Sequence, residues 1–593
     1  MNDFVKMVLA VLCGLVLMSI LSLILTFGFL GSLSAAGNAK PVLPREGVLK
    51  LDMSSILITE QAESVPNPMG MLQSVDITPV GIWDAVQAIN KAASDPSVSL
   101  LYIKTDGLSA SLTGVEELRA AIERFRQGGK AVIAYTENPS SGSYYLASAA
   151  DKVFMSSVCG ASPMITGIGS QMIYLKDILD KLGVNVQLIR HGKYKSAGEP
   201  YIRNTPSKEN LEQNQSMINS IWKTMASDVE ASRGIEEGSY SRMIDNLELL
   251  NAEDMVRAGL VDEVLSKEEL RGRIATLAGK EAFSDVTFIP FADYVKANFP
   301  AKAKGKDKIA IVYATGEIVE GPGQPGQIAG DKFSSMLTKI RNDKDVKAVV
   351  FRVASPGGSV TASDKIKQEI DLLRAEKPVV ASYGDYAASG GYWISNSCDK
   401  IFTDRTTLTG SIGVFSMIPD LSKTAKDILH VNVVSVGSSK HSDIFSLMRP
   451  LDADETAFMQ ASVEDIYSRF VGTVAQGRDL TEDYVDSIAQ GRVWTGSQSI
   501  ELGLTDAIGT LEDAVRYAAT LAGQGDDTLG WNIVSYPEPL SPLESILEMI
   551  QGARDDKDVL ADTPFKGIGK AFLGWDEHSE RVYARMPYEF IIK

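Results

Sequence analysis

The sequence predicts an α/β protein made of two tandem copies of one fold, preceded by a transmembrane helix. Three observations lead to this prediction. Short apolar runs alternate with longer segments of helical periodicity, similar motifs recur 248 residues apart at Ser141 and Ser389, and residues 7–30 contain no charged side chain. Alternating strands and helices are typical of βαβ units in a largely parallel sheet. A long internal repeat in a chain of 593 residues indicates two domains.

The uncharged segment is long enough to cross a bilayer, which requires about 20 apolar residues. A cleaved signal peptide is the alternative, because Ser-Ala-Ala-Gly at residues 34–37 resembles a cleavage site. The apolar core of a signal peptide usually has only about 7–15 residues, however. We therefore expect a membrane anchor at residues 5–32. Cations flank the segment on both sides, so charge alone does not fix its orientation.

Composition argues against several classes of function. The net charge of −18 disfavours nucleic acid as a partner. The three cysteines provide neither a disulfide framework nor metal-ligand spacing, and the four histidines form no HExxH motif. The chain also lacks a G-x-S-x-G motif. We expect no metal and no cofactor, and a histidine-based hydrolase has little support.

The repeat is clearest around a serine that follows a buried strand. Ser140-Ser-Gly-Ser-Tyr-Tyr in the first copy corresponds to Ala388-Ser-Gly-Gly-Tyr-Trp in the second. A stretch rich in lysine and alanine separates the copies and is interpreted as a linker. We expect an anchor at 5–32, a first copy at 47–298, a linker at 299–308, a second copy at 309–525 and a C-terminal extension at 526–593.

Within the second copy, two glycine-rich loops follow predicted strands. Loops at the carboxyl ends of parallel strands are where sites form in such sheets. The predicted strands are Ile309–Tyr313, Ala348–Phe351 and Val379–Ser382, the predicted helices are Phe333–Ile340 and Lys365–Leu373, and the loops are Ser355–Ser359 and Ala387–Gly391.

Ser389 is the candidate nucleophile of these loops. It follows a strand and opens an apparent helix, where free N–H groups and the helix dipole favour negative charge. Taken alone, a helix N-cap serine would be the simpler interpretation, as a tight turn would be for Pro356-Gly-Gly. Together, however, the amides of Gly358 and Gly390 could form an oxyanion hole beside the serine.

A nucleophilic serine needs a base, and no histidine stands in a recognisable partner motif. A lysine can serve if burial lowers its pKa towards neutrality. The first copy offers Lys193 and Lys195, and spacing alone does not choose between them. Residues 321–326 fit the G-x-G-x-x-G pattern, but two prolines stiffen the segment, which we interpret as a loop.

Four motifs together resemble the signal peptide peptidase A (protease IV) family in its long, duplicated form, and the resemblance covers nearly the whole chain. The motifs are Tyr194-Lys-Ser-Ala-Gly-Glu-Pro, Ser355-Pro-Gly-Gly, Ala388-Ser-Gly-Gly-Tyr and Gly410-Ser-Ile-Gly. The resemblance implies a fold similar to the Clp peptidase and crotonase group. It also implies that Ser389 is the nucleophile, that Lys195 is the general base and that Ser411 orients the lysine. Lys193 is then a surface neighbour.

The same resemblance implies a membrane-anchored serine endopeptidase that degrades cleaved signal peptides. The expected assembly is a homotetramer on the periplasmic side of the bacterial inner membrane, held to the lipid bilayer by the N-terminal helix. Two alternatives remain open: an acyl-thioester enzyme of the crotonase type, which also uses backbone oxyanion holes, and a non-catalytic membrane scaffold.

Each copy has kept a different half of the predicted site. In the first copy, Asp106-Gly-Leu-Ser replaces the glycine-rich loop of the second, and in the second copy Gly437-Ser-Ser-Lys replaces Gly192-Lys-Tyr-Lys. This pattern predicts one complete dyad formed across the two copies. Ser141 and Lys440 remain candidates for a second dyad.

Overall fold

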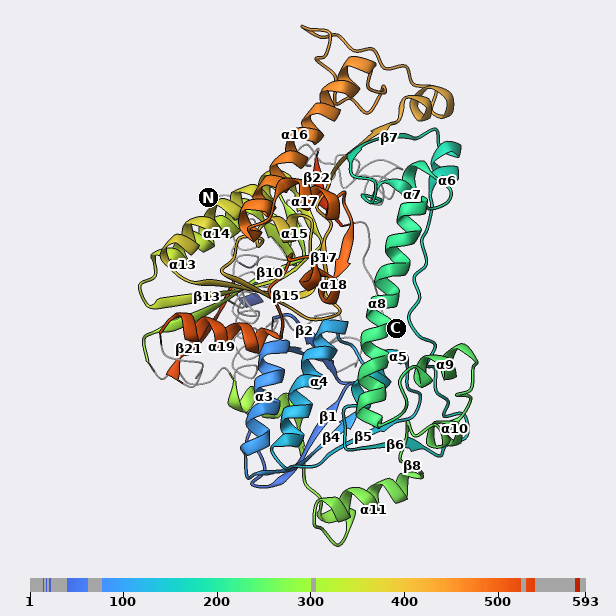
Figure 1. Ribbon diagram of the computed structural model, residues 1–593, viewed down its shortest axis with the longest axis vertical. Helices are drawn as coiled ribbons and strands as arrows, with labels where there is room; N and C mark the ends of the chain where they lie inside the picture. The colour runs from blue at the N-terminus through green and yellow to red at the C-terminus, as the bar shows by residue number, and fades with distance from the viewer. Residues whose placement is uncertain are drawn as a thin grey trace, which may run out of the picture.

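The computed structural model describes residues 14, 18, 21–22, 40–61, 77–299, 305–523, 530–538 and 582–586 (Figure 1). The membrane anchor expected at residues 5–32 falls almost entirely outside these ranges. In the part of the chain that is described, no helix combines the length and the apolar character needed to cross a bilayer.

The first copy is built around a parallel sheet of six strands. In spatial order the strands are β8 (Glu263–Leu265), β6 (Lys152–Ser156), β5 (Val132–Thr136), β4 (Val98–Lys104), β1 (Gly47–Asp52) and β9 (Phe288–Pro290). Strands β4 and β5 are buried along nearly their whole length, as expected where helices cover both faces of a parallel sheet. Helices α3 (Ile82–Ser94) and α4 (Leu112–Gln127) pack on each other beside it.

The second copy repeats this plan in an eight-stranded sheet. Its main path is β19 (Val493–Thr495), β17 (Leu408–Gly410), β15 (Val379–Ala388), β13 (Val346–Ser355), β10 (Lys308–Thr315) and β21 (Asn532–Tyr536), with β16 (Lys400–Thr403) joining β15 to β20 (Ala507–Ile508). The helices that pack with this sheet include α13 (Gly330–Asn342), α14 (Val360–Glu376) and α19 (Leu511–Leu521). The predicted α/β class and the duplication are confirmed.

The elements are longer than predicted, and two described strands, β21 and β22 (Tyr583–Arg585), lie beyond the expected end of the second copy. Strand β13 runs on to Ser355, and α14 begins at Val360, directly after the glycine-rich loop. Strand β21 pairs in parallel with β10, as β9 pairs with β1 in the first copy. The second sheet therefore recruits a strand from beyond residue 525, inside the segment expected to be an extension.

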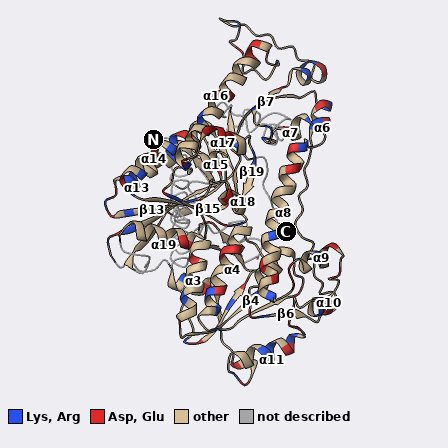
Figure 2. Ribbon diagram, in the orientation of Figure 1, with Lys and Arg blue, Asp and Glu red and all other residues tan. Residues whose placement is uncertain are grey.

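Each copy also contains one long helix of 26 residues, α8 (Lys208–Arg233) in the first and α16 (Ala453–Arg478) in the second. Ser207 caps the start of α8, and Asp452 caps the start of α16. Helices α8 and α11 (Lys267–Leu277) each carry both acidic and basic side chains, as Figure 2 shows. The net negative charge is therefore not concentrated on these two helices.

A third sheet joins the two copies. Its order is β12 (Gln327–Ala329), β11 (Glu317–Val319), β14 (Gly357–Ser359), β22 (Tyr583–Arg585), β18 (Val414–Asp420) and β7 (Asn185–His191). Strand β7 belongs to the first copy and pairs antiparallel with β18 of the second along its full length. In Figure 1, β7 accordingly lies next to α16, away from the other strands of its own copy.

The copies also meet along a polar seam on α4. The Thr113 hydroxyl donates to Asp385 at 2.8 Å, and Glu116 accepts from Arg405 at 2.6 Å. Deeper in the seam, the fully buried Arg352 pairs with Glu117 at 2.8 Å and with Glu60 at 2.7 Å. Burial raises the pKa of Glu117 to about 7 even beside this arginine. The seam therefore depends on Arg352 to hold two carboxylates out of water.

We predict that Arg352→Met lowers the free energy of unfolding by about 3–5 kcal/mol, because removing one partner of a buried ion pair leaves uncompensated charge. Urea denaturation at pH 8 measures this loss. Arg341→Met is the matched control, since Arg341 bonds Glu376 at 3.0 Å on a more exposed helix surface. A similar, small effect of both substitutions would contradict the prediction.

Candidate active site

Ser389 lies at a sharp turn between β15 and the short helix α15 (Gly390–Trp393). Its φ is +57°, which is unfavourable for a residue with a side chain and costs on the order of 1–3 kcal/mol. Two backbone bonds hold the turn: the Ser389 amide donates to Gly410 at 2.8 Å, and its carbonyl accepts from Trp393 at 2.8 Å. Ser389 occupies the N-cap position of α15, as the simpler interpretation expected, but its side chain makes no capping bond to the helix.

Lys195 reaches this serine from the first copy. It lies in the loop between β7 and α7 (Glu199–Ile202), and its side chain is completely buried in the second copy. Its amine lies 2.8 Å from the Ser389 hydroxyl oxygen and 3.0 Å from both the hydroxyl and the carbonyl oxygen of Ser411. The structure thus brings together the three side chains that the sequence singled out.

The partners of Lys195 match the bonding capacity of a neutral amine. The Ser411 carbonyl can only accept, and the Ser411 hydroxyl can donate to the Gly491 carbonyl at 3.4 Å while accepting from the lysine. A neutral amine would use its two N–H groups in this way and would have its lone pair left for Ser389. Burial lowers the pKa of Lys195 well below the 10.5 of a solvated lysine, which favours this neutral form.

The loop that carries Lys195 is bound on several sides. The Gln213 side chain donates to the Tyr194 carbonyl and to the Ser196 hydroxyl, both at 3.0 Å. Arg190 donates to the Lys195 carbonyl at 2.7 Å. A side chain at Gly491 would place its Cβ 2.6 Å from the Lys195 Cβ, so only glycine allows this approach. These neighbours fix the lysine backbone while leaving its amine free to face the serine.

The two glycine-rich loops pack directly against each other. A Cβ built on Gly357 would lie 2.6 Å from the Gly390 amide nitrogen, and one built on Gly391 would lie 2.5 Å from the Ser355 carbonyl oxygen. Gly357 and Gly358 have φ values of +97° and +155°, which side-chain-bearing residues rarely adopt. The structure therefore places the two predicted oxyanion donors, Gly358 and Gly390, on adjoining backbone segments beside Ser389.

The remaining candidates lie elsewhere. Lys193 is exposed, as predicted. Ser141 donates to the Gly167 carbonyl at 2.9 Å, whereas Lys440 is exposed and pairs with Asp454 at 2.5 Å, so these two residues form no second dyad. Residues 321–326 form an exposed connection between β11 and β12, as predicted for a loop.

Sequence reasoning missed Gln213, Arg190 and Gly491. Gln213 is a buried amide on α8, and Gly491 precedes β19, with no motif around either residue. Arg190 is a polar residue within β7. Their importance follows from one fact that no local pattern contains, namely that the loop after β7 lies against the second copy.

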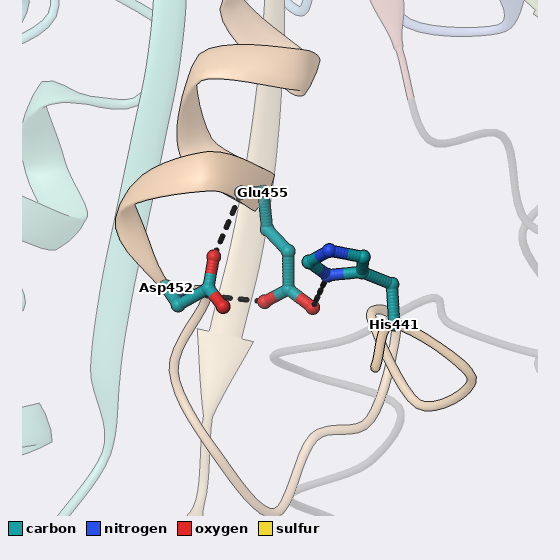
Figure 3. A group of neighbouring side chains, drawn as sticks. All are labelled: His441, Asp452 and Glu455. Carbon is teal, nitrogen blue, oxygen red and sulfur yellow. Dashed lines mark hydrogen bonds and ion pairs between the residues drawn. The ribbon is translucent and has the colours of Figure 1, made fainter. Parts of the chain in front are cut away.

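One group of side chains has the spacing of metal ligands. Within the described ranges, His441, Asp452 and Glu455 bring one ligand atom each to within 4.8 Å of one another (Figure 3). Glu455 already accepts from Arg449 at 2.7 Å and from the Asp452 amide at 3.0 Å, which completes the capping box of α16. The arginine supplies the positive charge that a metal ion would bring, so we interpret this group as a helix cap.

A buried serine bonded to a lysine amine beside two glycine-rich loops is an arrangement suited to a serine peptidase. The family comparison agrees: residues 124–281 and 371–525 match peptidase family S49, and the chain belongs to this family. The two matches fall in the two copies of the fold. The predicted resemblance to signal peptide peptidase A is thereby confirmed.

Several relatives are similar over most of their length. Protease 4 of Haemophilus influenzae is 34% identical over 541 residues, which cover 87% of each chain. Protease 4 of Salmonella typhi is 33% identical and covers 86% of this chain and 83% of the relative. The chloroplastic serine protease SPPA of Arabidopsis thaliana is 31% identical, and the match covers 82% of this chain and 69% of the relative. A ClpP1 mutant structure from Listeria monocytogenes covers 34% of this chain and 93% of its own, with 14% identity and a TM-score of 0.24.

We predict that Gly491→Ala abolishes most peptidase activity, by about 100-fold, because the new methyl group displaces Lys195 from the serine. Hydrolysis of a fluorogenic peptide measures the effect. Gly503→Ala is the matched control: it has a similar φ of +69°, but its nearest neighbour atom would lie 3.8 Å away. Equal losses in the two variants would show that backbone strain alone is responsible.

Proposed function

We propose that the protein hydrolyses peptide bonds through an acyl-enzyme formed by a Ser389–Lys195 dyad. The neutral Lys195 amine takes the proton from the Ser389 hydroxyl, whose oxygen attacks the peptide carbonyl carbon. The amine then gives this proton to the leaving nitrogen. Lys195 next activates the water that cleaves the ester, and Ser411 holds the lysine in place throughout.

The observation that carries the proposal is the 2.8 Å contact between Lys195 Nζ and Ser389 Oγ, two residues supplied by different copies of the fold. Two further features support it. The other partners of the amine both act as acceptors, which directs the lone pair at the serine. Complete burial, with no carboxylate of the described part of the chain beside the amine, favours the neutral lysine that a general base requires.

Developing negative charge on the carbonyl oxygen is stabilised by the amides of Gly358 and Gly390. Removing one donor of this kind typically lowers kcat by about 10²–10³-fold, because such donors are preorganised for the transition state. Glycine at both positions leaves the backbone accessible to the reacting carbonyl. The complete machinery requires neither metal nor cofactor.

The natural substrates under this proposal are cleaved signal peptides, processed on the periplasmic side of the bacterial inner membrane. Residues 5–32 anchor the chain in the bilayer. The catalytic part consists of two copies of the fold, residues 47–298 and 309–525. A linker at 299–308 joins these copies, and residues 526–593 follow them. The active assembly is a homotetramer. The support is the motif resemblance and the similarity to proteases that extends over most of the chain.

We predict that Ser389→Ala and Lys195→Ala each lower the kcat for a fluorogenic peptide by at least about 10³-fold, since each removes a reacting group. Ser141→Ala, at the equivalent position of the first copy, should retain wild-type activity. A serine-reactive phosphonate should label the wild type but not Ser389→Ala. Full activity of Lys195→Ala would assign the base elsewhere, and absence of labelling would favour the thioester enzyme or the scaffold.

Burial of Lys195 also predicts a pH-dependent cost in stability. An unfolded lysine binds its proton up to about pH 10.5, whereas the folded one releases it at lower pH, so stability rises with pH between the two values. We expect Lys195→Met to melt at a higher temperature than wild type at pH 7, with the gap closing towards pH 10. Thermal melts across this range measure the gap, and Lys193→Met, at the exposed neighbour, is the control for the loss of a lysine side chain.

A further inference from the structure

A short segment near the C-terminus lies in the same sheet as the active-site loops. Strand β22 pairs antiparallel with β14 on one side and with β18 on the other. Strand β14 carries Gly358, one of the two predicted oxyanion donors, and β18 follows Ser411 in the chain. Ala584, at the centre of the segment, is completely buried. The segment thus fills the slot between the two strands that border the dyad.

The register of this pairing directs one carbonyl group of the segment to the oxyanion site. The Met586 amide donates to the Pro356 carbonyl at 2.7 Å. Hydrogen-bonding pairs recur at every second residue of an antiparallel ladder, so the pair formed by Gly358 and Ala584 also bonds, and the Gly358 N–H faces the Ala584 carbonyl.

Distances from the Ala584 carbonyl oxygen to both glycine-rich loops also place this oxygen at the oxyanion site. The Ala584 carbonyl oxygen lies 3.1 Å from the Cβ that a side chain at Gly390 would have, and 2.1 Å from that of Gly357. This oxygen therefore lies between the two loops whose amides would stabilise a reacting carbonyl. An extended peptide that adds a strand at this place would present its scissile carbonyl in the same way.

The side chains of the segment meet a defined environment. The Tyr583 ring stacks on Phe415 with 5.8 Å between ring centroids. Arg585 forms an ion pair with Glu317 of β11 at 3.1 Å. Ala584, between them, has no exposed surface, so a larger side chain would have to displace its neighbours.

We infer that Val582–Met586 occupies the substrate-binding slot as a peptide substrate does, and that the site prefers a small residue followed by a basic one, the basic residue being selected by Glu317. The inference rests on the proposed function, because it names the substrate class of that same site. In this register Ser389 forms an ester with the carbonyl carbon of the small residue. The bond to the basic residue breaks, and its nitrogen leaves with the proton carried by Lys195.

Two quenched fluorogenic peptides test the selection by Glu317, one containing Val-Tyr-Ala-Arg-Met and the other Val-Tyr-Ala-Glu-Met. Exposed ion pairs have modest effects, so we expect the wild type to favour the arginine peptide about two- to fivefold in kcat/KM. Glu317→Gln should remove this preference and Glu317→Lys should reverse it. Glu320→Gln, which makes the same charge change one residue after β11, should keep it.

The outcomes separate the inference from the function on which it rests. Cleavage of both peptides at equal rates, or an unchanged preference in Glu317→Lys, overturns the selection by Glu317 while leaving the peptidase intact. Failure of the wild type to cleave either peptide faster than Ser389→Ala overturns the proposed function instead.

Occupation of the slot by the chain itself is tested by expelling the segment. Ala584→Trp is too large for the buried position, and Arg585→Glu places a like charge beside Glu317. Both variants should lower the KM for the arginine peptide several-fold, because the peptide no longer competes with the segment. A wild-type KM in both, with unchanged melting temperatures, would show that the segment does not occupy the slot.

Discussion

The active site depends above all on the antiparallel pairing of β7 with β18. This ladder takes a strand from the first copy and inserts it into a sheet of the second, and the loop that follows it carries Lys195. Seven consecutive residue pairs fix the register, so the lysine backbone is placed as firmly as any strand in the sheet. The seam on α4 adds buried ion pairs that also hold the two copies together.

The site itself reconciles opposing demands on one side chain. Burying a charged lysine without a counter-ion costs free energy, yet only a desolvated lysine has a pKa low enough to act as a base near neutral pH. The protein resolves this by surrounding the amine with oxygen atoms that accept hydrogen bonds from its N–H groups, and among the residues that the structure describes no carboxylate contacts it. A carboxylate would have stabilised the fold at the expense of the chemistry, because it would have raised the pKa of the lysine.

Much of this arrangement is predictable from sequence because its determinants are local. β-Branched runs such as that of β13 are buried on both faces, and the glycines of β14 are required by their own backbone angles. The partner of a strand is not a local property. Nothing in the sequence of β7 distinguishes a strand that pairs within its own copy from one that crosses to the other, and the roles of Gln213 and Gly491 follow only from that crossing. Strands β21 and β22 were likewise missed because five and three residues carry too little pattern.

The division of the dyad between two copies also sets an order in time. Lys195 and Ser389 are 194 residues apart in the chain. At the usual pace of synthesis, about 5–20 residues per second, the nucleophile leaves the ribosome about 10–40 seconds after the base. The first copy can fold during that interval, but under the proposed mechanism it has no peptide-cleaving centre until the second has folded and docked on it. A nascent chain with this mechanism therefore cleaves none of the peptides around it until most of its own synthesis is complete.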